Sequence, residues 1–265
     1  MTERNLKLTV AYDGTAYHGF QRQANAQAIQ QVLEEKLAKV FGHPLKTIGA
    51  GRTDTGVHAR GQVINFLTSS VIPAERIPMA SRGELPDDIV VMQAEDADVN
   101  FHARFDAKSK IYRYRILNAV SPDPLLRRYA WNYRRPLDAL AMNEAAAVLV
   151  GTHDFSAFRS VNGQPLDPVR TIFAVRCERT RPQIIECVFW GSGFLYHMVR
   201  NLVGTLVQVG LGQISVLEFQ QILMGRDRQQ AAATAPPQGL CLEQVQYEKM
   251  EIKPEVIRKV LDIGH

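Results

Sequence analysis

The hydrophobic pattern of the chain begins with alternation and then changes to a helical period. Leu6, Leu8 and Val10 are separated by single polar residues, which predicts a half-buried strand. Over residues 29–41 the apolar residues recur every three or four positions, and Gly42 follows them as a C-terminal helix cap. The other elements predicted in this half are two strands flanking the loop at 49–61, the second at 62–66, and a short helix within 73–89 that leads into a turn at 85–88.

Similar patterns return in the second half of the chain, after about residue 107. In the next predicted strand, Tyr112 and Tyr114 share one face, while Arg113 and Arg115 lie on the other. The remaining predicted elements are that strand at 111–117, an alanine-rich helix at 137–150, strands at 169–177 and 184–190, helices at 198–207 and 215–225, a strand at 240–245 and a terminal helix at 253–263. The two halves show no obvious sequence repeat, yet each contains strand, helix, strands and helix. We therefore predict an α+β fold built of two halves that share sheet structure.

The composition is that of an ordinary globular protein and excludes several classes. Of the 265 residues, 46% are hydrophobic and 22% are charged, which argues against a disordered or collagen-like chain. No stretch reaches the roughly 20 apolar residues of a membrane span, and no apolar core follows the charged N-terminal residues, so neither an anchor nor a secretory signal is expected. The cysteines at 177, 187 and 241 form no Cys-x-x-Cys pair, which argues against a cysteine zinc site or a disulfide framework. We expect a cytoplasmic protein.

Positive charge is concentrated in one segment, between His102 and Arg135. Nine basic residues there face two acidic ones, a difference of +7, whereas the whole chain carries +4. The basic residues are Arg104, Lys108, Lys110, Arg113, Arg115, Arg127, Arg128, Arg134 and Arg135, and they are interleaved with Phe105, Tyr112, Tyr114, Tyr129, Trp131 and Tyr133. Basic side chains can contact phosphates and aromatic rings can stack on unpaired bases, so RNA binding is one interpretation. A strand pair with a core-facing aromatic row and a solvated basic row explains the pattern equally well.

The loop at 49–59 is the most informative stretch of the sequence. Its three glycines surround Arg52, Asp54 and His58, and glycines allow a close approach to a ligand. A turn in which Asp54 caps local N–H groups is the competing interpretation. Several catalytic patterns are absent, namely a phosphate-binding Gly-Lys-Ser/Thr, a His-Glu-x-x-His zinc motif and a Gly-x-Ser-x-Gly nucleophile elbow. Histidine spacing suggests no metal site.

Asp54-Thr55-Gly56 also matches the Asp-Thr-Gly of aspartic proteases, where a homodimer would supply the second carboxylate. Arg52 stands only two residues before Asp54, and a nearby cation favours the ionised carboxylate over a shared-proton pair. An ionised, positioned carboxylate suits nucleophilic attack instead. The protease hypothesis requires peptide cleavage at acid pH.

The chain resembles the tRNA pseudouridine synthase A family over nearly its whole length, from about Leu6 to Val245. The motifs that carry the resemblance are Tyr12-Asp13-Gly14-Thr15, Gly19-Phe20-Gln21, Gly51-Arg52-Thr53-Asp54-Thr55-Gly56-Val57-His58-Ala59, Leu85-Pro86-Asp87-Asp88-Ile89, Phe101-His102-Ala103-Arg104, Lys110-Ile111-Tyr112-Arg113-Tyr114, His153-Asp154-Phe155, Gly193-Phe194-Leu195-Tyr196-His197-Met198-Val199-Arg200-Asn201 and Ala231-Ala232-Ala233-Thr234-Ala235-Pro236. The chain departs from the family at Ser81-Arg82, where Leu-Asn is usual, and at Ala28-Ile29-Gln30, where Thr-Val-Gln is common. Neither departure touches the catalytic set.

The resemblance implies a fold and an activity. The fold is the pseudouridine synthase fold, with two similar α/β halves whose mainly antiparallel mixed sheets join around a basic central cleft. The implied domains are an N-terminal half at 1–107 with the catalytic loop, a C-terminal half at 108–246 and a helical tail at 247–265. The implied activity is conversion of uridine to pseudouridine at positions 38, 39 and 40 of the tRNA anticodon stem-loop. The reaction needs no cofactor, and homodimers are usual in the family.

The resemblance also implies roles for individual residues. Asp54 is the essential carboxylate, which attacks C1′, adds to C6 or removes the C2′ proton. Arg52 fills or holds the gap left when the target uridine is extruded. Tyr112 stacks on the base and helps to deprotonate C5, and Arg200 pairs with the carboxylate. Phe194 and Leu195 line the apolar pocket, while His58 orients the loop. A non-catalytic RNA-binding protein remains the alternative function.

Overall fold

The computed structural model describes residues 3–160 and 167–262, so the last residue of the terminal helix predicted at 253–263 lies outside the described residues. The chain divides into two compact units by its contacts. Unit 1 comprises the chain up to Lys108 together with Leu242–Glu248. Unit 2 comprises Ser109–Cys241 and the chain from Lys249 onward. Each unit is therefore built from two separate stretches, and the chain passes from unit 1 to unit 2, back to unit 1 and again to unit 2.

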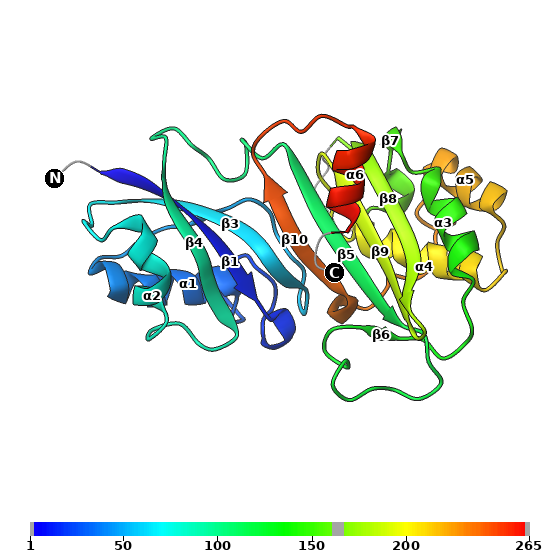
Figure 1. Cartoon of the computed structure of the whole chain (residues 1–265), viewed down its shortest axis with the longest axis horizontal. Helices are drawn as coiled ribbons and strands as arrows, with labels where there is room; N and C mark the ends of the chain where they lie inside the picture. Colours follow the sequence, from blue (N-terminus) through cyan, green and yellow to red (C-terminus); the bar gives the residue numbers. More distant parts are fainter. Residues whose placement is uncertain (1–2, 161–166, 263–265) are drawn as a thin grey trace. The chain divides into compact units, whose positions relative to one another are not determined.

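In unit 1 an antiparallel sheet is built around the first strand of the chain. The strands are β1 (Arg4–Tyr12), β2 (Ile48–Gly49), β3 (His58–Thr68), β4 (Ile89–Ala97) and β10 (Leu240–Gln246), in the order β4-β1-β3-β10 with β2 paired to β3. The residues of β10 from Leu242 onward belong to unit 1. Leu6, Leu8 and Val10 are completely buried, as their alternation predicts. The predicted helix is α1 (Ile29–Phe41), and Gly42 caps it in the left-handed conformation at φ 74°. The shorter α2 (Ile77–Ser81) lies near α1 (Figure 1).

The edge strand β4 has no counterpart among the predicted elements. Ile89 and Val91 are buried while Val90 and Met92 are exposed, so the side chains do alternate across the sheet. All four residues are apolar, however, and the alternation of exposure therefore leaves no hydrophobic–polar signal in the sequence. A register shift in the pairing with β1 interrupts the pattern after that point.

In unit 2 four strands pair antiparallel; one helix precedes the last three of them in the chain, two helices follow them, and another lies at the end of the chain (Figure 1). The strands are β5 (Ser109–Leu117), β7 (Gly151–Asp154), β8 (Val169–Arg181) and β9 (Ile184–Gly191), in the order β5-β9-β8-β7, and β6 (Trp131–Asn132) pairs with β5 in parallel. The helices are α3 (Ala139–Ala147), α4 (Met198–Gly210), α5 (Val216–Gly225) and α6 (Pro254–Leu261). Short 3₁₀ turns occur at Gly14–Ala16, Ala74–Arg76, Ser156–Phe158 and Pro237–Gly239. The helix predicted from Ser215 is confirmed, because Ser215 and Glu218 form a capping box at the start of α5.

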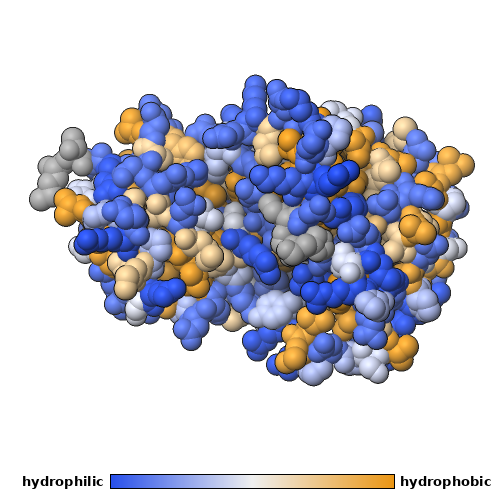
Figure 2. Space-filling view, in the orientation of Figure 1, coloured by the Kyte–Doolittle hydropathy of each residue, from blue (hydrophilic) through white to orange (hydrophobic). Residues whose placement is uncertain are grey.

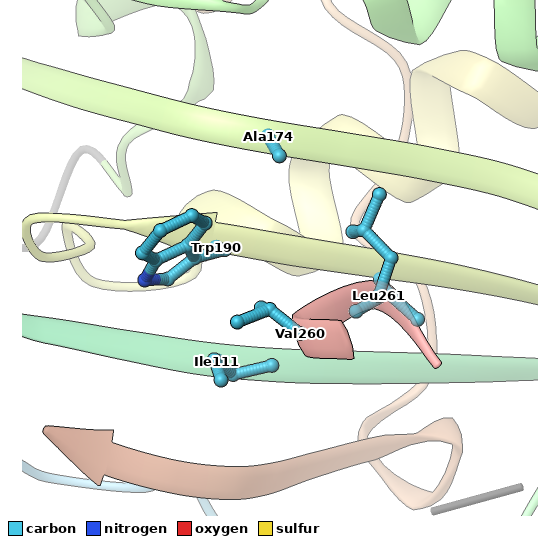
Figure 3. Close-up of a cluster of buried hydrophobic side chains, with 6 residues drawn as sticks. Ile111, Ala174, Trp190, Val260 and Leu261 are labelled. Carbon is cyan, nitrogen blue, oxygen red and sulfur yellow. The ribbon is translucent and has the colours of Figure 1, made fainter. Parts of the chain in front are cut away.

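The terminal helix α6 covers part of one face of the unit 2 sheet (Figure 3). Val260 and Leu261 pack with Ile111 of β5, Trp190 of β9 and Ala174 of β8. The predicted terminal helix is thus observed as α6 and packs against unit 2. In the described part of the chain, no helix has the length and apolar character needed to cross a membrane.

The same sheet face carries a buried cluster of charges. Arg113 donates to Glu186 at 2.6 Å, and Arg115 donates to the other carboxylate oxygen of Glu186 at 2.7–2.8 Å. Arg113 is only 2% exposed and Glu186 only 5%. Arg113 and Arg115 bind the same carboxylate and so share one face of β5, as predicted, while Tyr112 and Tyr114 are buried on the other face. The expected solvated basic row is wrong for Arg113, because the cross-strand carboxylate allows its charge to be buried.

Candidate active-site residues

The loop between β2 and β3 makes a tight turn at the carboxylate singled out by the sequence. The N–H of Val57 donates to the backbone carbonyl of Asp54 at 3.1 Å, and Gly56 adopts a left-handed conformation at φ 76°. Asp54 is half-buried and Arg52 is exposed. The loop therefore presents a partly desolvated carboxylate and a solvent-facing guanidinium from positions two residues apart.

The segment that follows β1 holds this loop by close backbone contact. A Cβ atom at Gly14 would collide with the carbonyl oxygen of Val57, and one at Gly19 would stand 2.6 Å from the carbonyl oxygen of Thr53. Gly19 also has a positive φ of 85°, which favours glycine. The N–H of Phe20 donates to the Thr53 carbonyl at 3.0 Å. These contacts explain why two separated glycine motifs accompany the Asp54 loop.

His58 follows the loop at the start of β3 and is almost fully buried. Its Nδ1 accepts a hydrogen bond from the N–H of Gly14 at 3.1 Å, and an oxygen of Asp13 lies 3.1 Å from the same atom. The Gly14 bond requires an unprotonated Nδ1, whereas a protonated imidazole would donate to Asp13. Asp13 itself caps the 3₁₀ turn by accepting from the N–H of Thr15. These contacts support the prediction that His58 orients the loop.

In unit 2, Tyr112 and Phe194 form an aromatic pair. Their ring centroids are 5.1 Å apart and the planes meet at 82°, an edge-to-face arrangement. Tyr112 is 7% exposed on β5, Phe194 is half-buried, and Leu195 beside it is buried. A side chain at Gly191 would crowd the ring of Phe194 at 3.2 Å. The structure therefore brings together two of the predicted substrate-binding residues, Tyr112 and Phe194, and buries the third, Leu195.

The start of α4 places Arg200, the fourth predicted binding residue of this unit. His197 precedes the helix in a left-handed conformation at φ 62°, which a non-glycine residue rarely adopts, so the chain turns sharply between Leu195 and α4. Arg200 donates through Nε to the carbonyl of Ala235 at 2.7 Å, and the N–H of Ala235 donates to the Arg200 carbonyl at 3.1 Å. This reciprocal pair fixes the guanidinium against the segment at 231–236.

Two polar residues to which the sequence analysis gave no role in the site hold that segment. Asn201 is fully buried, and its side-chain oxygen accepts from the hydroxyl of Thr234 at 2.6 Å. Tyr114 donates to the carbonyl of Pro236 at 2.7 Å. Burial raises the pKa of Tyr114 well above its usual value, although the charge of Arg200 opposes the increase. The sequence could have pointed to Asn201, because it directly follows Arg200 in the motif at 193–201. A buried asparagine normally has specific hydrogen-bond partners.

The basic segment divides into exposed and buried parts. Arg113 is buried against Glu186 and Arg115 is half-buried. The exposed basic side chains are Arg104, Lys108, Arg127, Arg128, Arg134 and Arg135. The loop between β5 and β6 also exposes apolar residues, including Leu125 at 83%, and hydrophobic residues are visible over this loop among hydrophilic ones in Figure 2. Exposed guanidinium groups beside apolar side chains can contact phosphates and bases.

Each unit thus contributes its own set of predicted residues. Arg52 and Asp54 occupy one loop of unit 1, while Tyr112, Phe194 and Leu195 cluster in unit 2, with Arg200 on the helix that follows. Within residues 3–160 and 167–262, no three His, Cys, Asp or Glu side chains are grouped so that they could hold a metal ion.

Comparisons with known proteins cover most of the chain. A family model described as tRNA pseudouridine synthase matches residues 8–106 and 145–248. The tRNA pseudouridine synthase A of Thermoanaerobacter sp. (strain X514) is 48% identical over 244 residues, which cover 92% of this chain and 100% of that protein. The enzyme of the same name from Exiguobacterium sp. (strain ATCC BAA-1283 / AT1b) is 47% identical over 94% of this chain and 100% of its own length. The crystal structure of a Cbf5-Nop10-Gar1 complex matches at a TM-score of 0.38 with 11% identity, and this chain covers 48% of that one while 89% of this chain is aligned.

Proposed function

Because this chain belongs to the tRNA pseudouridine synthase family, we propose that it converts uridine to pseudouridine at positions 38, 39 and 40 of the tRNA anticodon stem-loop. The family match confirms the resemblance inferred from the motifs. The reaction is an isomerisation, in which the N1–C1′ bond breaks, the uracil turns and C5 bonds to C1′. The proton lost from C5 is balanced by the proton that N1 gains, so the reaction itself requires no redox partner or group donor.

Asp54 is the catalytic carboxylate in this proposal. The observation that carries it is the turn at Asp54, which is half-buried and clamped by the segment after β1, because a catalytic group must be held rigidly. The carboxylate attacks C1′, adds to C6 of the base or removes the C2′ proton. Arg52 is exposed and can contact the RNA backbone where the target nucleotide is extruded.

Tyr112, Phe194, Leu195 and Arg200 bind the substrate in the same proposal. The edge-to-face pair of Tyr112 and Phe194, next to the buried Leu195, offers aromatic and apolar surface of the kind on which an extruded base stacks. Arg200 is anchored through Nε to Ala235, which orients its guanidinium for an anionic partner. The exposed basic side chains of the His102–Arg135 segment bind tRNA phosphates. We further propose that the protein acts in the cytoplasm and that it is a homodimer. Sedimentation analysis of the purified chain tests the oligomeric state.

The test of this function is release of tritium from tRNA labelled at C5 of uracil, because pseudouridine formation frees the C5 proton. The wild-type protein is expected to release label from uridines 38–40 and none from a tRNA that carries cytidine at those positions. If neither tRNA releases tritium although the protein binds tRNA, the result would favour a non-catalytic RNA-binding protein. Release from other positions only would retain the chemistry and overturn the site assignment.

Removing two exposed charges next to Leu125 is expected to weaken tRNA binding. The double variant Arg127→Gln/Arg128→Gln should raise the Kd several-fold and lower the slope of log Kd against log salt by roughly 1–2, because about one counterion is released for each phosphate contact. Filter binding across a salt series measures both values. The matched control is Arg258→Gln/Lys259→Gln, which removes two exposed charges from α6. Equal slopes in the two double variants would exclude this loop from the tRNA-binding surface.

A further inference from the structure

We propose that Tyr12 is a positioning residue for the Asp54 loop, and that it acts through a buried hydroxyl pair with Thr53. The two hydroxyl oxygens are 2.8 Å apart, with Tyr12 at the end of β1 and Thr53 directly before Asp54. The inference rests on the proposed catalytic role of Asp54. It adds a residue whose restraint on the loop passes through the side chain of Thr53.

The pair lies in the interior of unit 1. Tyr12 is 4% exposed and Thr53 is 6% exposed. In such surroundings a hydroxyl that loses its partner is costly, so the bond restrains the geometry more strongly than an exposed one would. Thr53 is therefore held by its side chain as well as by its backbone, whose carbonyl accepts from Phe20 at 3.0 Å.

A second buried side chain restrains the loop on the other side of Arg52. Gln62 of β3 is completely buried, and its Nε2 donates to the carbonyl of Gly51 at 2.8 Å and lies 3.5 Å from the Tyr12 hydroxyl. Side chains from two strands thus hold Gly51 and Thr53, the residues that flank Arg52. Asp54 follows immediately and forms the turn described above.

The restraint originates in β1, which is paired on one side with β3 and on the other with β4. Tyr12 is opposite Ala59 of β3 and Ile89 of β4, so neighbours on both sides fix the position of its backbone. Because the backbone of Tyr12 is fixed, its hydroxyl is restrained too, and the hydrogen bond restrains Thr53 in turn. A catalytic group displaced by about 1 Å can lose about 100-fold in rate, which makes such a restraint relevant to turnover.

The first test is Tyr12→Phe, which removes only the hydroxyl. We expect kcat for tRNA to fall roughly 10- to 100-fold while KM stays within about twofold. The matched control is Tyr247→Phe, which removes a tyrosine hydroxyl of unit 1 that donates to Ala103 at 2.7 Å. This control should keep the wild-type kcat. Equal kcat losses in the two variants, or a loss that follows the melting temperature, would mean a purely structural role and overturn the inference.

The second test exchanges the partner hydroxyl. Thr53→Val keeps the shape of the side chain and should reproduce the kcat loss, whereas Thr53→Ser keeps the hydroxyl and should restore most of it. Thr68→Val is the control, since Thr68 is likewise buried, at the end of β3, and its hydroxyl bonds His43 at 2.7 Å. Indistinguishable kcat values for Thr53→Val and Thr53→Ser would contradict the proposal.

The variant Asp54→Ala separates this inference from the function on which it rests. An inactive Asp54→Ala with a fully active Tyr12→Phe overturns the positioning role and leaves the proposed function intact. An active Asp54→Ala overturns both. The inference is supported when Asp54→Ala is inactive, Tyr12→Phe and Thr53→Val are slow, and Thr53→Ser is close to wild type.

Discussion

Replacing Asp54 with asparagine is expected to abolish pseudouridine formation and to leave tRNA binding intact. Asparagine has nearly the same shape, so the turn that joins Asp54 to Val57 through backbone atoms can persist. The amide lacks the negative charge that attack on carbon or proton removal requires. Loss of a group that takes part in the chemistry lowers kcat by about 10⁴-fold or more.

The measurement is single-turnover tritium release with enzyme in excess, together with the Kd from filter binding. The control is Asp96→Asn, which removes an exposed carboxylate of β4 that pairs with Arg4. It should leave kcat and Kd close to wild type. Retention of more than about a tenth of the wild-type rate by Asp54→Asn would refute the catalytic role. A large rise in Kd would instead assign Asp54 to binding.

Replacing Glu186 with alanine should have the largest effect on stability. The carboxylate compensates the charge of Arg113, which is 2% exposed, and also binds the half-buried Arg115. Removing one partner of a buried ion pair costs about 3–5 kcal/mol, because the charge that faced it stays in the interior. For a protein of this size the melting temperature should fall by roughly 10 °C.

A suitable comparison for this variant lies directly across the strand pair. Glu178 of β8 is in register with Glu186, and its side chain is 43% exposed and forms an ion pair with Arg176. Glu178→Ala should therefore cost at most about 1 kcal/mol, as exposed ion pairs do. Calorimetry of both variants makes the comparison. Similar melting temperatures for them would show that the buried cluster contributes little.

The local elements were the most predictable part of this protein. The alternation of Leu6, Leu8 and Val10 predicted β1, and helical spacing closed by Gly42 predicted α1, because these patterns reflect interactions within a few residues. β3 is longer than its prediction, since it begins at His58 at the end of the loop. β4 was missed because the buried and exposed positions at its start, residues 89–92, are all apolar.

The candidate residues were predictable for a different reason. Chemical types at fixed spacing, such as Arg52 and Asp54 within one glycine-rich loop, can be read without knowing the fold. The residues that hold them could not be read in this way. Tyr12 and Thr53 are 41 residues apart in the chain, and nothing near either of them in the sequence indicates their contact.

The amino-acid sequence by itself determined the strands and helices with clear periodicity, the capping at Gly42 and Ser215, and the residue types that the loop at 49–59 offers. Only the tertiary structure decided the strand order β4-β1-β3-β10, the burial of Arg113 against Glu186 and the anchoring of Arg200 to Ala235. The physical reason is the separation along the chain of the residues that interact. Periodicity and capping arise between close neighbours in the chain, whereas strand pairing and buried polar contacts join residues far apart, whose partners are set when the whole unit packs.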